Sequence, residues 1–316
     1  MVSVIIPLYN GKNTILKTLR SLLTQSDFFN ELIIVNDCSS DNSAELAEKF
    51  LSAKNIDFKI IKHIKNRGLA AAYNTGIKAA RGELLIFAHQ DIELYKDAFK
   101  NLLEPLKDND IIGAYHYTYQ SLAVWQKYNF WQKYFFCRWV NKKAYGMNGK
   151  FDAFRSAALL AIGLFDEKKF KSAGEDADLL VRLQGKGKIV KTEAGILHLH
   201  DEKPGFNIFD IIKKQAQLSE AQGALFRKHC WQLGNIFGLA KNFFREILLL
   251  GLCLPIINFF SLALIIFYCF FVSRVMFIYE YKNWRAYLLP LLNFSLFFVS
   301  LIFSIRGFVT GKQTYH

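Results

Sequence analysis

The sequence predicts an α/β protein, with a mostly parallel, doubly wound sheet in its N-terminal two thirds and membrane-associated helices in its last third. Three observations support this prediction. Apolar strand-like runs alternate with helical periods in the N-terminal part, and two long uncharged stretches lie near the C-terminus. The 316 residues are 52% hydrophobic and carry a net charge of +13. This composition excludes a disordered or fibrous chain and is typical of a protein that meets a membrane.

The N-terminal part alternates predicted strands with predicted helices. The strands cover residues 2–6, 31–35, 58–61 and 84–87, and the helices cover 14–24, 43–51 and 70–80. Strands that alternate with helices in this way form parallel sheets. Ligands of such sheets bind at the carboxyl ends of the strands, so the residues that follow each strand are the candidates for a binding site.

Polar residues follow all four predicted strands, at 7–10, 36–41, 66–68 and 89–91. Each loop also has a structural explanation, for example Asp41 as a helix cap. Their convergence at one edge of the sheet favours a binding site. Further along, Glu175 and Asp176 fall in the first turn of a predicted helix, where compensation of the helix dipole would be worth only about 0.3–1 kcal/mol.

In order and spacing, these segments resemble glycosyltransferase family 2, whose members have the GT-A fold of nucleotide-sugar transferases. The resemblance rests on Val4–Asn10, Ile34–Asp41, Asn66–Gly76, Arg81–Leu85 and Gly174–Leu179. It covers residues 1 to about 200 and implies a Rossmann-like catalytic domain over 1–205. The implied reaction is an inverting single displacement from a nucleoside diphosphate sugar, with a UDP-sugar favoured.

The resemblance also implies which residues bind the nucleotide sugar. Asp37 would accept a hydrogen bond from a ring NH of the base, and Arg67 would lie near the phosphates. The expected set is Pro7, Tyr9, Asn10, Asp37, Asn66, Arg67, Gly68, Asn74, His89 and Gln90. One departure is Cys38, which stands where the family usually has Gly.

A divalent cation, Mn²⁺ or Mg²⁺, is implied as the cofactor. Family members commonly carry Asp-x-Asp after the fourth strand, where this chain has His89-Gln90-Asp91. Asp91 is expected to ligate the metal together with the diphosphate. His89 either contacts the ligand or shapes the loop. His198 is expected at the metal, with His200 on the same strand face as an alternative and a core histidine as a second interpretation.

The acids at the start of the helix are interpreted, by the resemblance, as the catalytic pair. Asp176 is expected to be the general base that takes the proton from the acceptor hydroxyl, with Glu175 positioning the acceptor or sharing that role. The dipole at the helix start is expected to keep Asp176 ionised near neutral pH.

The last third of the chain is predicted to attach the protein to the cell membrane. Amphipathic interfacial helices are expected over 206–246, and a transmembrane hairpin within 247–316. The uncharged runs Ile247–Val272 and Ala286–Ile305 are both long enough to cross a hydrocarbon layer of about 30 Å. Positive residues before the first run outnumber those between the runs, which predicts a cytosolic catalytic domain with two spans.

An insertion at about 115–145 is rich in aromatic and basic residues and contains no acid. This mixture suits a membrane surface, so phospholipid is an expected partner and the insertion is expected to bring a lipid-borne acceptor to Asp176. Packing beside the sheet is the alternative. Because no nucleic-acid-binding motif accompanies the insertion, no nucleic-acid partner is expected.

Together these features predict a membrane-anchored, non-processive glycosyltransferase that moves one sugar to a lipid-linked or cell-envelope glycan acceptor. A polyprenyl-phosphate glycosyltransferase is the first alternative. Its acceptor, the lipid phosphate, needs little deprotonation, which would make Glu175 and Asp176 less necessary. The second is a catalytically silent nucleotide-sugar-binding membrane protein, suggested by His89 and Cys38 at positions where the family has other residues.

Overall fold

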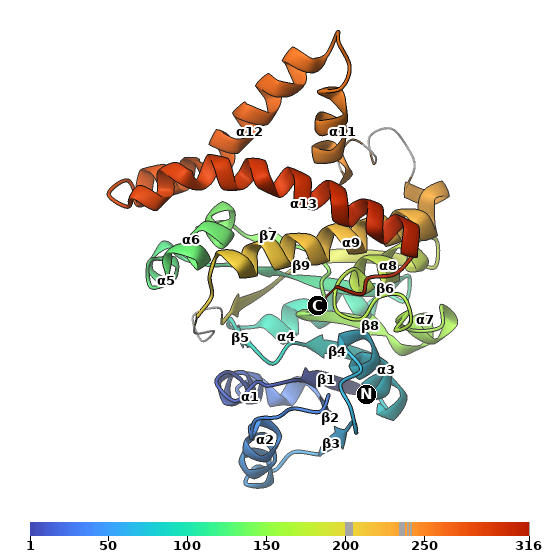
Figure 1. Cartoon of the computed structure of the whole chain (residues 1–316). Coiled ribbons are helices and arrows are strands. Elements are labelled where there is room, and N and C mark those ends of the chain that lie inside the picture. The colour runs from blue at the N-terminus through green and yellow to red at the C-terminus, as the bar shows by residue number, and fades with distance from the viewer. Residues whose placement is uncertain (200–204, 234–237, 239, 241, 316) are drawn as a thin grey trace. The chain divides into compact units, whose positions relative to one another are not determined.

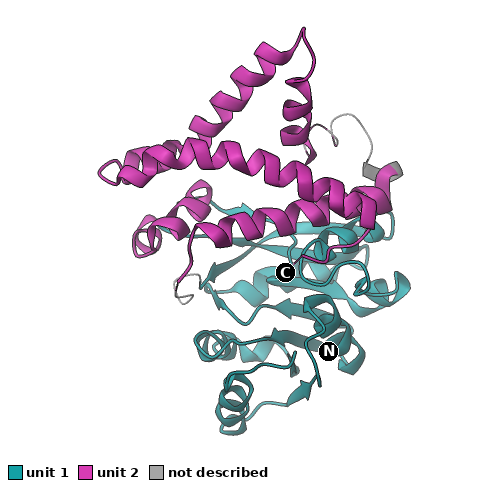
Figure 2. Ribbon diagram, in the orientation of Figure 1, with its two compact units in different colours: residues 1–121, 141–204 teal, residues 122–140, 205–316 magenta. Residues whose placement is uncertain are grey.

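The structure is a computed structural model that describes residues 1–199, 205–233, 238, 240 and 242–315. The chain divides into two compact units, shown in different colours in Figure 2. Unit 1 contains residues 1–121 and 141–204, and unit 2 contains 122–140 and 205–316. The middle of the predicted insertion therefore belongs to the same unit as the C-terminal helices.

Unit 1 is built on one sheet (Figure 1). Its strands are β1 (Val2–Leu8), β2 (Glu31–Asn36), β3 (Phe58–Lys62), β4 (Leu84–Ala88), β5 (Ile92–Leu94), β6 (Ile111–Thr118), β7 (Ala144–Tyr145), β8 (Phe151–Arg155) and β9 (Lys188–His198). The order is β3-β2-β1-β4-β8-β6-β9-β5, with β7 paired to β6. The four predicted strands β1 to β4 pair in parallel, whereas β8 and β5 run antiparallel to their neighbours.

Helices cover both faces of this sheet. Since successive residues of a strand point to opposite faces, neighbouring residues of β1 pack against different helices. Unit 1 contains α1 (Ile15–Leu23), α2 (Ser43–Ser52), α3 (Leu69–Ala79), α4 (Ala98–Leu103), α7 (Ser156–Ala161) and α8 (Glu175–Leu183). Val4 and Ile6 of β1 pack in the cluster that includes α1, α2 and α4. Ile5, between them, packs in the cluster with α3, α7 and α8. The predicted doubly wound α/β fold is confirmed.

The helices of unit 2 are α5 (Leu122–Gln126), α6 (Phe130–Phe136), α9 (Ile208–Leu233), α11 (Phe244–Gly251), α12 (Asn258–Tyr279) and α13 (Leu289–Thr310). The first predicted span, Ile247–Val272, is not one helix: α11 ends at Gly251 and α12 begins at Asn258. Pro255 lies in this break, where its missing NH and fixed φ disfavour a continuous helix. Pro290, by contrast, lies in the first turn of α13, where proline is tolerated.

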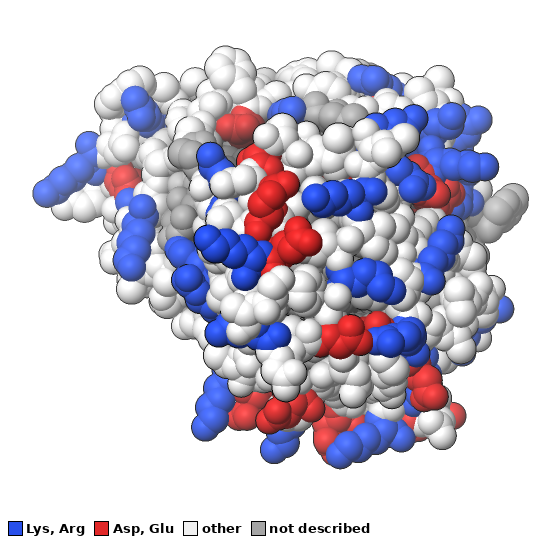
Figure 3. Space-filling model, turned by 90° about the horizontal axis from the view of Figure 1, so that it is seen from below, with Lys and Arg blue, Asp and Glu red and all other residues white. Residues whose placement is uncertain are grey.

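Two segments of unit 2, Asn258–Tyr279 and Trp284–Thr310, are long and apolar enough to cross a membrane by length and composition. The predicted interfacial segment is represented by α9, while part of 234–241 lies outside the described residues. On the face of the molecule seen in Figure 3, basic and acidic side chains lie intermixed rather than sorted by sign.

The aromatic insertion does not lie on the surface as one segment. Trp125 is fully buried, and Tyr128 and Tyr134 are buried with it in the core of unit 2, which also contains Leu292 of α13. Trp139, at the end of the segment, is about half exposed, at 48%. Packing therefore explains the middle of the insertion, where the indole of Trp125 fills the core of unit 2 instead of lying on a membrane surface.

Unit 2 depends on a very close contact between α9 and α13. A methyl group on Gly307 of α13 would overlap the backbone of Glu220, and one on Gly223 of α9 would overlap the carbonyl oxygen of Ser304. Glu220 is fully buried and accepts hydrogen bonds from the backbone NH groups of Thr314 and Tyr315, at 2.7 and 2.6 Å. Glycine at these two positions lets the helix backbones touch, and the carboxylate fixes the C-terminal tail to α9.

We predict that Gly307→Leu destabilises unit 2, because the added side chain must push α13 away from α9. Overpacking of this kind typically costs about 1–3 kcal/mol, and here the clash is with backbone. Thermal unfolding and limited proteolysis of the full-length chain in detergent should show a lower melting temperature and faster cleavage. The control is Ala263→Leu on the exposed side of α12, which should melt like the wild type. A Gly307→Leu variant as stable as this control would contradict the predicted contact.

Candidate active site

The candidate site lies in unit 1, where the carboxyl ends of β1, β2 and β4 meet the loop after β3 and the start of α8. Two clusters can be distinguished. One contains His89, Asp91 and His198, and the other contains Glu175 and Asp176 with the loop before β8. Every predicted site residue from Pro7 to His198 lies in the described part of the chain, whereas His200 lies outside it.

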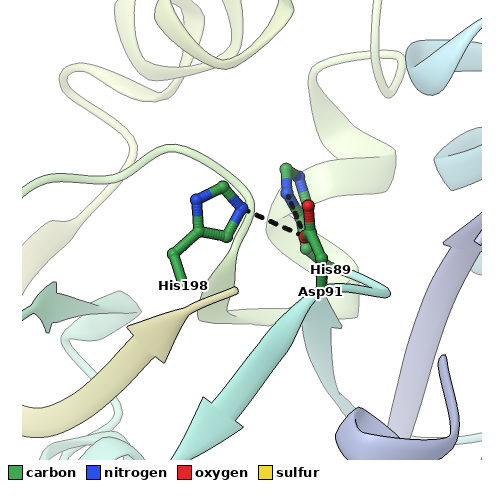
Figure 4. A group of neighbouring side chains, drawn as sticks. All are labelled: His89, Asp91 and His198. Atoms are coloured by element: carbon green, nitrogen blue, oxygen red, sulfur yellow. Dashed lines mark ion pairs between the residues drawn. The ribbon is translucent and has the colours of Figure 1, made fainter. Parts of the chain in front are cut away.

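His89, Asp91 and His198 form a compact group of potential metal ligands (Figure 4). Asp91 Oδ1 lies 3.1 Å from Nε2 of His198 and 3.8 Å from Nδ1 of His89. One ligand atom from each side chain lies within 4.8 Å of the others. The antiparallel pairing of β5 with β9 creates this group, because it sets Ile92 opposite His198 and so brings Asp91 beside the end of β9.

The electrostatics of the group suit metal binding. Burial lowers the pKa of His89 to about 3, although the charge of Asp91 opposes this shift. Burial also lowers the pKa of His198, again against Asp91. Both imidazoles are therefore neutral at physiological pH, which is the form that ligates a metal. Nε2 of His89 is buried and meets no hydrogen-bond partner among the described residues, so it is available to a ligand.

This donor set, two imidazoles and one carboxylate, fits a divalent transition metal such as Mn²⁺ better than Mg²⁺, which prefers oxygen ligands. The sequence left the role of His89 open between ligand contact and loop shape. The structure places its ring in the same group as Asp91 and His198.

The second cluster surrounds the start of α8. Gly174, at φ 83°, turns the chain into the helix, and Glu175 and Asp176 occupy its first turn as predicted. Both acids line a small pocket together with Tyr73, Asn148 and Gly149. The catalytic pair proposed from the sequence therefore faces a hollow.

Burial raises the pKa of Asp176 above its ordinary value, while a 2.7 Å hydrogen bond from the NH of Ala177 works in the opposite direction and the charge of Asp152 adds to the rise. The sequence predicted that the helix start would keep this carboxylate ionised. In the structure the burial of this side chain outweighs the effect of the helix start on the pKa of Asp176. A raised pKa is the usual property of a residue that takes up a proton.

A buried pair that the sequence did not reveal fixes the wall of this pocket. His116 Nδ1 and Asp152 Oδ1 lie 2.8 Å apart, and neither side chain is exposed. The other oxygen of Asp152 accepts hydrogen bonds from the NH groups of Asn148 and Gly149, at 2.9 and 2.6 Å. The hydroxyl of Tyr73 donates to the carbonyl of Gly149. These bonds hold the loop rigid beside Asp176; nothing in the sequence spacing of His116 and Asp152 pointed to them.

Asp37 organises the loop after β3. Its carboxylate accepts hydrogen bonds from the NH groups of Arg67 and Gly68, at 2.9 and 2.7 Å, and lies 2.6 Å from Nδ1 of His63. Nε2 of His63 lies 2.9 Å from the hydroxyl of Thr75. The carboxylate therefore shapes the loop that was predicted to meet the phosphates. His63 was not among the predicted residues, although its position just after a strand was a possible signal.

The remaining predicted residues connect the loops to each other. Gln90 exchanges two hydrogen bonds with the backbone of Tyr9, at 2.8 and 3.0 Å. Asn10 accepts a hydrogen bond from the NH of Ser40. Tyr9 is about half exposed, at 48%, and is free to meet a ligand with its ring, whereas Pro7 is buried in β1.

Four further residues lie at the loop after β3 or behind it. The guanidinium of Arg67 pairs with Glu167 at 3.0 Å on the surface, and Asn66 donates to the carbonyl of Asp37 at 3.4 Å. Gly68 has φ 91°, and a Cβ there would press on the backbone of Lys171, so only glycine fits. Asn74 is buried and exchanges two hydrogen bonds of 2.9 Å with the backbone of Phe165. Asn74 thus stabilises the packing of α3 rather than facing a ligand.

The chain is similar to known glycosyltransferases. Residues 3–164 match the family model described as Glycosyl transferase family 2. The chain is 38% identical over 123 residues to the glycosyltransferase EpsJ of Bacillus subtilis, covering 38% of this chain and 35% of EpsJ. It is 39% identical over 113 residues to the poly-beta-1,6-N-acetyl-D-glucosamine synthase of Staphylococcus epidermidis, covering 36% and 27%. The matched region thus spans about a third or less of these relatives.

Two solved structures show the same fold. The mannosyltransferase PcManGT from Pyrobaculum calidifontis, in complex with GDP-Man and Mn²⁺, aligns with a TM-score of 0.61 at 14% identity, covering 96% of this chain and 86% of PcManGT. S. aureus TarS 1-349 aligns with a TM-score of 0.51 at 16% identity, covering 99% and 90%. Identities this low support the fold alone.

We predict that Asp91→Ala weakens Mn²⁺ binding to the full-length protein at least about tenfold. Replacing a residue that only hydrogen-bonds to a metal ligand typically already lowers metal affinity about tenfold or more, and Asp91 is itself a potential ligand. His198→Ala should act in the same direction. Titration followed by electron paramagnetic resonance of free Mn²⁺ measures the effect. The matched control is Asp27→Ala, an exposed acid remote from the group, which should bind Mn²⁺ like the wild type. Equal affinities for Asp91→Ala and the control would rule out this metal site.

Proposed function

The chain belongs to glycosyl transferase family 2, and from this we propose that it is a membrane-attached, non-processive enzyme that transfers one sugar, with inversion, from a nucleoside diphosphate sugar to a lipid-linked or cell-envelope glycan acceptor. The observation that carries the proposal is the presence of two clusters in unit 1. One is a group of side chains suited to a divalent cation, and the other, at the start of α8, contains an acid with a raised pKa in a pocket.

His89, Asp91 and His198 would hold a divalent cation, for which Mn²⁺ is the best fit. When bound, the cation neutralises the charge that develops on the departing diphosphate. The Mn²⁺ in the PcManGT complex supports this assignment. The donor nucleotide lies along the loops of Tyr9, Asp37 and Arg67, whose positions are fixed by the hydrogen bonds described above. A UDP-sugar remains our preferred donor.

Asp176 acts as the general base. Its raised pKa brings the carboxylate closer to the operating pH, where a base transfers protons most effectively. Glu175, buried in the same pocket, positions the acceptor. A base of this kind serves a hydroxyl acceptor, since a lipid phosphate is already ionised. The two acids therefore favour a sugar or lipid-linked sugar over a polyprenyl phosphate.

Unit 2 attaches the enzyme to the cell membrane, with the catalytic unit on the cytosolic side. The two long apolar segments and the excess of basic residues before the first of them support this attachment. Two helices that cross the membrane are the arrangement that the sequence favours.

We predict that Asp176→Asn lowers kcat by about 10²–10⁴-fold while donor affinity stays close to that of the wild type, because the amide keeps the shape but cannot take a proton. In the wild type, kcat should fall as the pH drops through the raised pKa of Asp176, at a higher pH than for an ordinary aspartate. In the variant this acid limb should be absent. Initial rates against pH measure both effects. A variant with the wild-type kcat would remove Asp176 from catalysis.

The identity of the donor can be tested by measuring the thermal stability of the chain. A nucleotide sugar that binds the folded chain should raise its melting temperature in proportion to concentration and affinity. We expect a UDP-sugar to do so with Mn²⁺, and the shift to shrink in Asp91→Ala. Incubation with the stabilising donor should then release the nucleoside diphosphate when a polyprenyl diphosphate sugar is added. Stabilisation without any nucleotide release would favour a catalytically silent binding protein, and release with polyprenyl phosphate alone would favour the polyprenyl-phosphate enzyme.

A further inference from the structure

We propose that unit 2 holds the protein on one face of a lipid bilayer, with α11 and α12 inserted as a hairpin and α13 lying in the plane of the interface. The inference rests on the membrane attachment proposed above and specifies its geometry. The chain would enter and leave the membrane on the same side, instead of crossing it twice.

The register between α9 and α13 supports this arrangement. Ser219 Oγ lies 3.0 Å from Ser300 Oγ, and Nη1 of Arg227 donates to the carbonyl of Phe308 at 3.0 Å, each pair 81 residues apart. Gly223 and Ser304, which also touch, have the same separation (304 − 223 = 81). In these three pairs the partner on α13 advances together with the residue on α9, so the two helices run parallel, side by side, as Figure 1 also shows.

The register limits how deep α13 can lie in a bilayer. Extended toward the N-termini, it sets Lys213 and Lys214 of α9 at the level of Phe294 and Ser295. These lie near the middle of the uncharged run 286–305. If α13 crossed the bilayer, two lysines would lie at the level of the hydrocarbon centre, where ionised side chains are rare because they are costly to bury. The close contact with α9 therefore keeps α13 near the polar interface.

The exposure of α13 is also one-sided. Its exposed large apolar side chains are Leu291, Phe294, Phe298, Ile302, Ile305, Phe308 and Val309. At about 100° per residue they fall within an arc of about 120°. The opposite side of the helix is buried and includes Asn293, Ser300, Ser304 and Gly307. α13 therefore presents its apolar side chains outward on one side only, while its other side makes polar contacts within unit 2.

α11 and α12 join α13 at different points along its length. Glu246 of α11 accepts hydrogen bonds from Ser300 and Ser304 in the second half of α13, at 2.7 and 2.8 Å. Asn293, in the first half of α13, donates to the hydroxyl of Ser273 of α12 at 3.0 Å. The two legs of the hairpin therefore stand on different halves of α13. In Figure 1 the legs meet at a tip away from α13.

The tip and the outer surface of this hairpin are apolar. Its exposed large side chains include Leu254, Ile256, Phe259, Phe260 and Phe267. Leu254 and Ile256 lie in the break between α11 and α12, beside Pro255. Such a tip is stable in hydrocarbon only if its backbone groups are satisfied, and the NH groups of Leu252, Cys253 and Leu254 do find carbonyl partners in the turn.

The expected partner is a bilayer with anionic headgroups. Between α12 and α13 the exposed residues Tyr281, Trp284 and Tyr287 lie next to Lys282 and Arg285. Amphipathic aromatics with basic side chains are typical of the headgroup level, where they meet lipid phosphates. In the proposed arrangement this turn lies on the same side of the membrane as the catalytic unit. In a two-span hairpin it lies on the opposite side.

The test is the sidedness of that turn. In the full-length chain, with Cys38, Cys230 and Cys253 replaced by serine, Lys282→Cys provides one accessible thiol, because Cys137 and Cys269 are buried. Sealed inside-out and right-side-out membrane vesicles are treated with a membrane-impermeant maleimide. A matched chain that keeps only Cys38 of the three reports the side of the catalytic unit.

We expect Lys282→Cys and Cys38 to be labelled in the same vesicle preparation and to lose labelling in the other. Leu254→Cys, at the hairpin tip, should be labelled in neither until detergent is added. Labelling of Lys282→Cys and Cys38 in opposite preparations would overturn the inference while leaving membrane attachment intact. A chain that stays in the soluble fraction without detergent would overturn both the inference and the proposed attachment.

Discussion

The pairing of β5 with β9 is the contact on which the candidate chemistry depends. It is a short antiparallel ladder, only three residue pairs long, yet it joins the loop after β4 to the end of a strand more than 100 residues later in the chain. Without it Asp91 would keep its place at the sheet edge but would lose His198, and His89 would face a single carboxylate. The metal group is therefore a property of the completed sheet rather than of the short sequence around His89.

Two buried carboxylates keep the surrounding loops in shape. Asp37 binds the backbone of the loop after β3, and Asp152, paired with His116, binds the loop beside Asp176. A buried carboxylate is stable only when its oxygens are satisfied, and here backbone NH groups and imidazoles satisfy them. In the proposed function these loops hold a flexible, charged donor. Because the hydrogen bonds keep the loops ordered beforehand, little conformational entropy is lost when the donor binds.

Unit 2 follows a different principle. Its helices are joined by small residues and by a few buried polar groups, among them Glu220, Glu246 and Asn293, each of which is hydrogen-bonded to a neighbouring helix or to the tail. Apolar side chains remain on the outside. This is the pattern expected where the surrounding medium is itself apolar and helix association depends on close packing and polar contacts. In the proposed membrane arrangement, the same close packing between α9 and α13 keeps α13 near the polar interface.

The sequence by itself determined the parallel half of the sheet, the helix that carries Glu175 and Asp176, and the apolar character of the C-terminal part, because these depend on local periodicity and on residues near each other in the chain. Tertiary structure alone decided that His89 joins Asp91 and His198, that His116 and Asp152 support the pocket, that Trp125 is buried, and that burial raises the pKa of Asp176. These properties arise between segments far apart in sequence, and solvent exclusion at a site is a property of packing, which no local pattern encodes.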